Sequence, residues 1–218
     1  MSDDGGVPTP SSSRSVKIGT DERTGWSSER PRRDGAPPRP PDISVRNRVL
    51  APSDRLRYSP GSLLVIVGPA SSDPARFAER VIEERSAVLS MAKVRALLAG
   101  RVPADQIEAR AAELLQTAVA KRIENKQSVA LAIEGFDAEE RERYVRLAHA
   151  QRRPRHLILI EGPREQVLDE ERAPLDALRR ALDDGELGSE GFQTAMRLGG
   201  SALAELKRIV FAPPPRED

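Results

Sequence analysis

Short, continuous runs of apolar residues constrain the fold of this chain more than any other feature. The clearest runs are SLLVIV (62–67), SVALAIE (128–134) and HLILIE (156–161). Runs of this length without polar alternation are typical of strands that are buried on both faces. Between them lie longer stretches with apolar residues at helical spacing, such as residues 105–125. Strands that alternate with helices predict right-handed crossovers and a mostly parallel sheet.

The expected elements cover residues 62–211. Strands are expected at 62–67, 87–90, 128–134, 156–161 and 208–211, and helices at 74–85, 92–99, 105–125, 138–151, 164–184 and 202–206. Pro174 predicts a break or kink within 164–184, and residues 190–198 fit either an extended or a loosely helical segment. The predicted fold class is α/β, with three layers and a mostly parallel sheet of about five strands between flanking helices.

The first 58 residues differ in composition from the rest. They hold 8 of the 18 prolines and 9 serines, and their charge is +3, whereas residues 59–218 carry −2. Such a segment buries too little apolar surface to offset its ordering entropy. We therefore expect a disordered Pro/Ser/Arg-rich tail over 1–58, in which 43–58 can dock as a lead-in, and a domain over 59–218. The tail is either a partner-binding or phosphorylatable arm, around Arg14 and Trp26, or a soluble spacer, which composition favours.

Composition also excludes several classes of function. The chain has no cysteine, which rules out a disulfide framework, a thiolate metal site and a catalytic thiol. We find no secretory signal and no apolar run long enough to span a membrane, so we expect a cytoplasmic protein without membrane contact. A net charge of +1 and 3% aromatic residues give weak support to nucleic-acid binding. A protein is the favoured partner.

The loop after the first predicted strand is the main candidate site. Residues 68–75 read G-P-A-S-S-D-P-A, where a phosphate-binding loop requires G-x-x-x-x-G-K-[ST]. Asp73, Pro74 and Ala75 stand in place of the second glycine, the lysine and the Ser/Thr. A carboxylate repels phosphate, proline lacks both the ammonium and the N–H, and alanine lacks the hydroxyl that holds Mg²⁺. The same residues favour a helix start, with Asp73 as N-cap and Pro74 at the first helical position.

Taken together, residues 63–211 resemble the bacterial polynucleotide kinase branch of the P-loop phosphotransferases. The matches to that family's loop and following helix are Gly68, Pro69, Ser72, Phe77 and Ala78. Further matches are Ser90 and Arg95 after the second strand, Arg143 after the third, and the segment 175–192. The resemblance implies a P-loop NTPase-like fold with ATP and Mg²⁺ as ligands. It also implies a degenerate phosphate-binding loop made of Gly68, Pro69, Ser71, Ser72, Asp73, Pro74 and Ala75.

The departures from the family argue against its activity. Besides the loop residues, the family's aspartate general base is replaced by Ala92. Phosphoryl transfer needs the lysine, the Mg²⁺ and this base, and losing one such group costs roughly 10²–10³ in rate. The leading hypothesis is a catalytically silent, kinase-like interaction or regulatory protein, in which weak nucleotide binding is left open. The alternatives are an unconventional ATP-dependent polynucleotide or small-molecule kinase or NTPase that recruits Lys93, Arg95 or Arg143, and a tail-driven adaptor.

Further candidates lie at the ends of later strands. Glu134 and Asp137 fit either a Mg²⁺-binding or catalytic pair or a strand end followed by a helix cap, and the capping pattern is favoured. Ligands of parallel sheets sit outside the carboxyl ends of the strands, so residues 68–75, 90–95, 134–137 and 161–164 are expected to surround one cleft. Glu161 could face this cleft. The candidate catalytic residues are thus Glu134, Asp137, Arg95 and Arg143, and the candidate metal ligand is Glu134. The Arg-rich turn 151–155 fits an anion patch or, as favoured, a solvated helix end.

Overall fold

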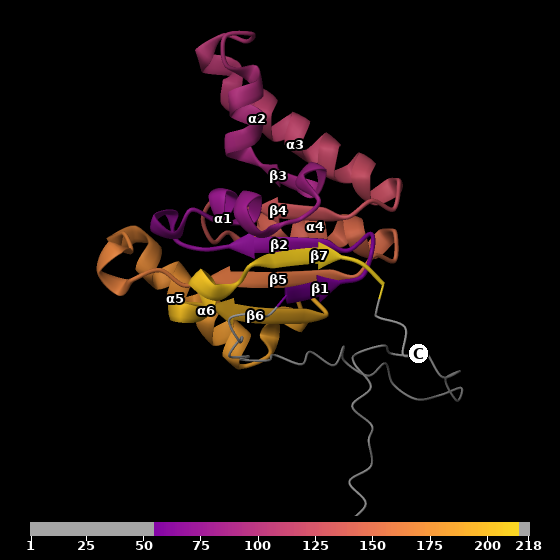
Figure 1. Ribbon diagram of the computed structural model, residues 1–218. Coiled ribbons are helices and arrows are strands. Elements are labelled where there is room, and N and C mark those ends of the chain that lie inside the picture. The colour runs from indigo at the N-terminus through magenta and orange to yellow at the C-terminus, as the bar shows by residue number, and fades with distance from the viewer. Residues whose placement is uncertain (1–54, 214–218) are drawn as a thin grey trace, which may run out of the picture. The chain divides into compact units, whose positions relative to one another are not determined.

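The computed structural model of the protein describes residues 55–213, and a parallel five-stranded sheet forms its centre (Figure 1). Its strand order is β3-β4-β2-β5-β6. The strands are β2 (Leu63–Val67), β3 (Val88–Ser90), β4 (Val129–Ala132), β5 (Arg155–Ile160) and β6 (Thr194–Leu198). The predicted fold class, a three-layer, P-loop-like α/β domain, is confirmed. Within residues 55–213, no helix combines the length and the apolar composition that crossing a bilayer requires.

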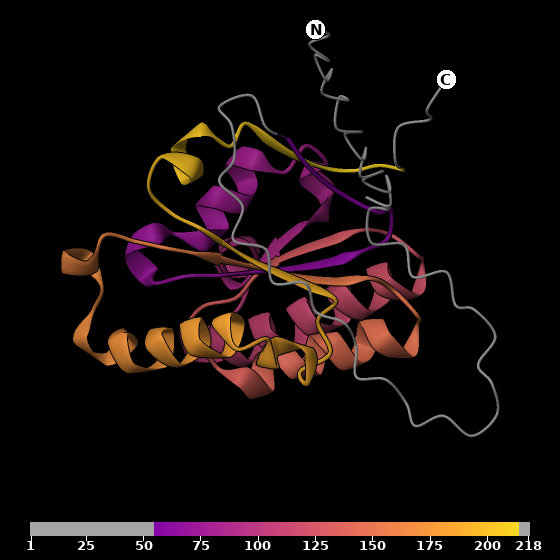
Figure 2. The same ribbon diagram turned by 90° about the horizontal axis from the view of Figure 1, so that it is seen from below.

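The central strand β2 divides the core into two halves. All five of its residues are buried, and because side chains alternate along a strand, they enter two different clusters. Leu63 belongs to the cluster beneath α3 (Ile107–Glu124), α4 (Ala138–Ala150) and α5 (Asp169–Asp183). Leu64 belongs to the cluster beneath α1 (Pro74–Val81) and α6 (Gly200–Glu205). Figure 2 shows these helices on opposite faces of the sheet.

A second, two-stranded sheet lies over the α1 side of the core. Strand β1 (Arg55–Tyr58) pairs in parallel with β7 (Arg208–Phe211). Residues 208–211 are therefore a strand, as predicted, but not a strand of the main sheet. Residues 55–58 belong to the folded part rather than to the tail, because Leu56 is buried against α1 and β7. The remaining predictions for the tail concern residues outside 55–213.

Two elements differ from their predicted form, and a third segment follows one of its two predicted forms. Helix α1 ends at Val81 and not at residue 85, because Ile82 turns into an extended conformation and bridges to Ile209. Pro174 does not break α5, since the proline lies on the exposed side while buried leucines hold the helix to the sheet. The ambiguous segment 190–198 supplies the edge strand β6, which pairs with β5. Helix α2 (Met91–Leu98) lies where it was predicted.

The topology opens a crevice at the carboxyl edge of the sheet. The chain leaves β2 toward the face that carries α1, whereas it leaves the two neighbouring strands, β4 and β5, toward the opposite face. Adjacent connections that diverge in this way create a ligand-binding crevice in open parallel sheets. The residues predicted to surround one cleft therefore do lie at the same edge.

One buried polar group stands out near the opposite edge. His156 on β5 is 9% exposed, and its Nδ1 lies 2.8 Å from the Thr194 hydroxyl. Its Nε2 has no hydrogen-bond partner among the described residues, and its ring centroid lies 4.6 Å from that of Tyr58. Burial, and secondarily the charge of Arg155, lower the pKa of His156 from 6.5 to about 4. The folded protein thus holds a neutral imidazole well below pH 6.5.

We expect acid to destabilise the protein through His156. Below pH 6.5 the unfolded chain binds a proton that the folded chain excludes down to about pH 4. The free energy of unfolding therefore falls as the pH drops through this window, by about 3 kcal/mol at most. Urea titrations of the wild type and of His156→Gln between pH 7 and 4 measure the slope, which the variant should flatten. His149→Gln, which changes an exposed histidine of α4, should keep the wild-type slope; an unchanged slope in His156→Gln would contradict the assignment.

Candidate functional site

A pocket of about 300 Å³ occupies the crevice at the carboxyl edge. Its lining comes from the loop after β2, the start of α1, the ends of β3 and β4, and the first turn of α5. The residues are Gly68, Ala70, Asp73, Pro74, Ala75, Ser90, Ala92, Ala132, Ile133, Glu134, Gly135 and Glu171. Predicted loop residues and Glu134 therefore share one pocket, whereas Pro69, Ser71, Ser72, Asp137, Arg95 and Arg143 are not part of its lining.

The loop after β2 folds as a tight turn followed by a capped helix. Gly68 is required there because a Cβ would lie 2.9 Å from the Ile160 carbonyl oxygen. Residues 70–72 form a single 3₁₀ turn, and the Ser72 hydroxyl donates to the Pro69 carbonyl oxygen at 2.7 Å. Asp73 then adopts φ +44°, and its Oδ1 accepts the Arg76 N–H at 3.0 Å. The interpretation of Asp73 as an N-cap, with Pro74 at the first helical position, is confirmed.

A carboxylate from a distant helix also binds this loop. Glu171, in the first turn of α5, accepts the Ala70 N–H through Oε1 at 2.8 Å. Two further loop amides have internal acceptors, since Ser72 N–H donates to the Pro69 carbonyl and Asp73 N–H to the Ala70 carbonyl. A phosphate-binding loop presents such amides to its ligand. Here the protein's own oxygens accept three of these amides, and the sequence contained no signal for the Glu171 contact.

The cationic residues proposed as substitutes for the missing lysine are held elsewhere. Lys93 Nζ donates to the Val88 carbonyl oxygen at 2.9 Å. Arg95 forms a bidentate pair with Glu108 at 2.7 and 2.8 Å and also binds Glu134 at 2.6 Å. Arg143 is exposed on α4.

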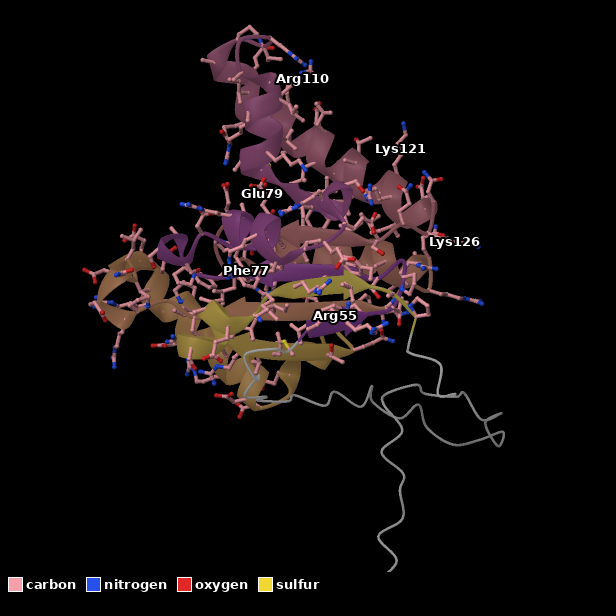
Figure 3. The ribbon with its side chains drawn as sticks, in the orientation of Figure 1. Arg55, Phe77, Glu79, Arg110, Lys121 and Lys126 are labelled. Carbon is pink, nitrogen blue, oxygen red and sulfur yellow. The ribbon has the colours of Figure 1, made fainter. Side chains whose placement is uncertain are left out.

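Other cationic side chains also lie away from the pocket. Lys121 and Lys126, labelled in Figure 3, lie at the far end of α3, where the chain enters the amino edge of the sheet. The figure also labels the buried Phe77 and the exposed Glu79 on α1. Among residues 55–213, no lysine, arginine or histidine lines the pocket.

Glu134 and Asp137 follow the favoured interpretation, a strand end followed by a helix cap, rather than a ligand pair. Asp137 caps α4 by accepting the Glu139 N–H at 3.1 Å, whereas the Glu134 carboxylate is bound by Arg95. Burial, followed by the nearby charge of Asp137 and then of Glu134, raises the pKa of Glu140, while Arg143 opposes this rise. In the described residues, no three acidic or histidine side chains are grouped as a metal site would require.

The remaining candidates have structural partners. Glu161 lies between Arg179 and Arg197, and although its burial opposes ionisation, these hydrogen bonds lower its pKa. In the Arg-rich turn, Arg153 donates to the Gly61 carbonyl at 2.9 Å and Arg155 to the Gly191 carbonyl at 2.7 Å. These two arginines hold neighbouring loops, so neither the anion patch nor the solvated helix end describes them.

Sequence reasoning missed a buried ion pair beside the site. Arg141 of α4 is 4% exposed and binds both oxygens of Glu190 at 2.8 and 3.0 Å. It also donates to the Phe136 carbonyl oxygen at 2.7 Å. The pair therefore links the loop after β4, which carries Gly135 of the pocket, to the segment before β6. Arg141 lies among other charged residues of α4, so the sequence gave no indication that this one is buried.

The pocket is therefore an anionic cavity with small apolar walls. Its ionisable lining consists of Asp73, Glu134 and Glu171, which can accept hydrogen bonds and stabilise positive charge. None of them can offset the negative charge that develops in phosphoryl transfer.

The sequence was also compared with known proteins. No protein-family model matches it, and a comparison with curated proteins finds no match.

We expect loss of Arg141 to destabilise the fold strongly. Arg141→Ala leaves Glu190 buried without a counter-charge, which should lower the free energy of unfolding by about 3 kcal/mol. The matched control is Arg146→Ala on the same helix, whose pair with Glu142 is exposed and should contribute under about 0.5 kcal/mol. Chemical denaturation of both variants measures the difference. If both variants lose the same free energy of unfolding, the buried pair contributes no more to stability than the exposed pair.

Proposed function

We propose that this protein is a non-catalytic interaction or regulatory domain, in which a kinase-like fold binds a protein partner and transfers no phosphate. The observation that supports this most directly is the state of the loop after β2. Its Ala70 amide donates to Glu171 and its Ser72 and Asp73 amides donate to backbone carbonyls. These three amides are therefore not available for the cradle on which phosphate binding depends.

The charge of the pocket supports the same proposal. Asp73, Glu134 and Glu171 all belong to its lining, and each would repel the phosphates of a nucleotide. Because the pocket is partly enclosed, this repulsion is less screened than it would be on an open surface. ATP that binds without a cation would have to overcome this repulsion.

The alternative, an unconventional kinase, needs a cation that can take the place of the P-loop lysine. The three candidates named for that role have other partners or other positions: Lys93 binds a backbone carbonyl, Arg95 binds two carboxylates, and Arg143 is exposed on α4. Recruiting Arg95 would break its bonds to Glu108 and Glu134 and would leave their charges in place. The arrangement therefore favours the non-catalytic role.

Calorimetric titration of the full-length protein with ATP and GTP, each with and without Mg²⁺, tests the proposal. We expect no saturable heat at millimolar nucleotide and no hydrolysis, because three of the loop amides are occupied and the pocket is anionic. Saturable ATP binding that Arg95→Ala or Arg143→Ala abolishes would overturn the proposal in favour of the kinase alternative.

A restored loop provides the complementary test. Asp73→Gly, Pro74→Lys and Ala75→Ser together recreate G-x-x-x-x-G-K-S, and Glu171→Gln removes the competing charge. We expect this fourfold variant to bind Mg-ATP at least about tenfold more tightly than the parent protein, as the lysine and the hydroxyl return. The control is Glu171→Gln alone, which should not bind ATP. If this control binds ATP as well as the fourfold variant, the substitutions at 73–75 are not the reason for the loss.

A further inference from the structure

A nitrogen atom without a hydrogen-bond partner lies beneath strand β1. It is Nε2 of His156, and within residues 55–213 no other buried side-chain nitrogen or oxygen lacks a partner. The residue is 9% exposed, and its second ring nitrogen, Nδ1, lies 2.8 Å from the Thr194 hydroxyl. A buried polar atom without a partner loses the hydrogen bonds that water would give it. The closed arrangement of β1 therefore costs free energy that contact of Nε2 with water would recover.

Uptake of a proton would increase this cost. An imidazolium has two N–H donors, and the N–H at Nε2 would find no acceptor among the described residues. Burial, followed by the positive charge of Arg155, holds the pKa of His156 at about 4. Tyr58, the titratable group that β1 places against the ring, stays neutral because burial raises its pKa. The neighbours of these two rings from other strands are uncharged, namely Leu64 of β2, Thr194 and Met196 of β6, and Phe211 of β7.

Strand β1 supplies the cover over this imidazole. The ring centroid of Tyr58 lies 4.6 Å from that of His156 and 6.4 Å from that of Phe211. Among the described strands, β1 pairs with β7 alone, whereas β7 is also bridged to residues 82–83 through Ile209. The main chain of β1 is therefore held on one side only. Moving β1 is the smallest change of the fold that brings water to His156.

The turn between β1 and β2 provides a hinge for such a movement. Gly61 in this turn adopts φ +72°, which suits glycine. Its N–H donates to the Ser128 hydroxyl at 2.9 Å, and its carbonyl oxygen accepts Nε of Arg153 at 2.9 Å. These contacts fix the turn to the segments that precede β4 and β5. Residues before the turn can therefore move while the turn and the main sheet stay in place.

We propose that protonation of His156 releases β1 from the folded domain. When the ring takes up a proton from solvent, Tyr58 moves away from it, β1 separates from β7, and water solvates the imidazolium, while the main sheet stays folded. The point at which residues 1–54 join the domain then moves from Arg55 to the turn that contains Gly61. The inference is independent of the proposed function, because neither His156 nor β1 lines the pocket.

Hydrogen exchange of the full-length protein at pH 7 and pH 5, followed by mass spectrometry, tests this inference. Each observed rate is divided by the intrinsic rate at the same pH, which gives the fraction of time that a segment is open. The open form binds a proton at the ordinary pKa of histidine, whereas the closed form excludes it down to about pH 4. We expect the open fraction of β1 to rise about twentyfold from pH 7 to pH 5. Strands β2 and β5 should stay far better protected than β1 at both pH values.

Two variants assign the effect to one residue. His156→Gln keeps a polar side chain that does not titrate, so the open fraction of β1 should no longer depend on pH. His149→Gln, at an exposed position of α4, should keep the rise seen in the wild type. Circular dichroism checks that each variant is folded. If His156→Gln does not fold, the comparison of β1 with β2 and β5 in the wild type still decides.

Three results would each overturn the inference. The first is an open fraction of β1 that stays the same between pH 7 and pH 5. The second is a folded His156→Gln variant in which β1 still opens as the wild type does. The third is an equal open fraction of β1 and β2 at pH 5, because β1 would then open only when the whole domain unfolds.

Discussion

The burial of β2 on both faces is the constraint on which the rest of the structure depends. Its five side chains have no access to solvent, so each face of the strand needs its own layer of helices. On one face lies α1, from the chain directly after β2, and on the other lie α4 and α5, from the chain after its neighbours β4 and β5. This division places the loop that begins at Gly68 above the crevice.

The crevice combines a position that favours anions with side chains that repel them. In a parallel sheet, the amides at the start of the first helix normally attract negative ligands. Asp73 and Glu171 are negative groups too, and as parts of the chain they accept the Arg76 and Ala70 amides, one each. The charge that a bound phosphate would bring is already present. What the pocket lacks is therefore positive charge.

The fold could be predicted from the sequence because each signal was local. The runs at 62–67, 128–134 and 156–161 needed only their own residues to identify them as buried strands. The capping roles of Asp73 and Asp137 could likewise be read from two or three neighbouring residues. By contrast, the contact of Glu171 with Ala70 joins residues about 100 positions apart.

Local sequence patterns also could not predict the edge strand β6 or the ion pair between Arg141 and Glu190. Residues 194–198 have a mixed burial pattern because one side of an edge strand is partly exposed, which left their form ambiguous. Nothing distinguished Arg141 from the exposed arginines around it until α4 was placed against Glu190. Local propensity identifies elements, whereas partners across the sheet depend on how the elements pack.

The pairing of β1 with β7 has a consequence for how the chain folds. Arg55 pairs with Arg208, so this small sheet closes a loop that contains almost the whole domain. Such a contact gains little until the intervening elements are in place, because closing a long loop costs entropy before any contact compensates for it. We expect β1 and β7 to join late and to separate first, exposing Leu56 and Ile209 while the main sheet persists.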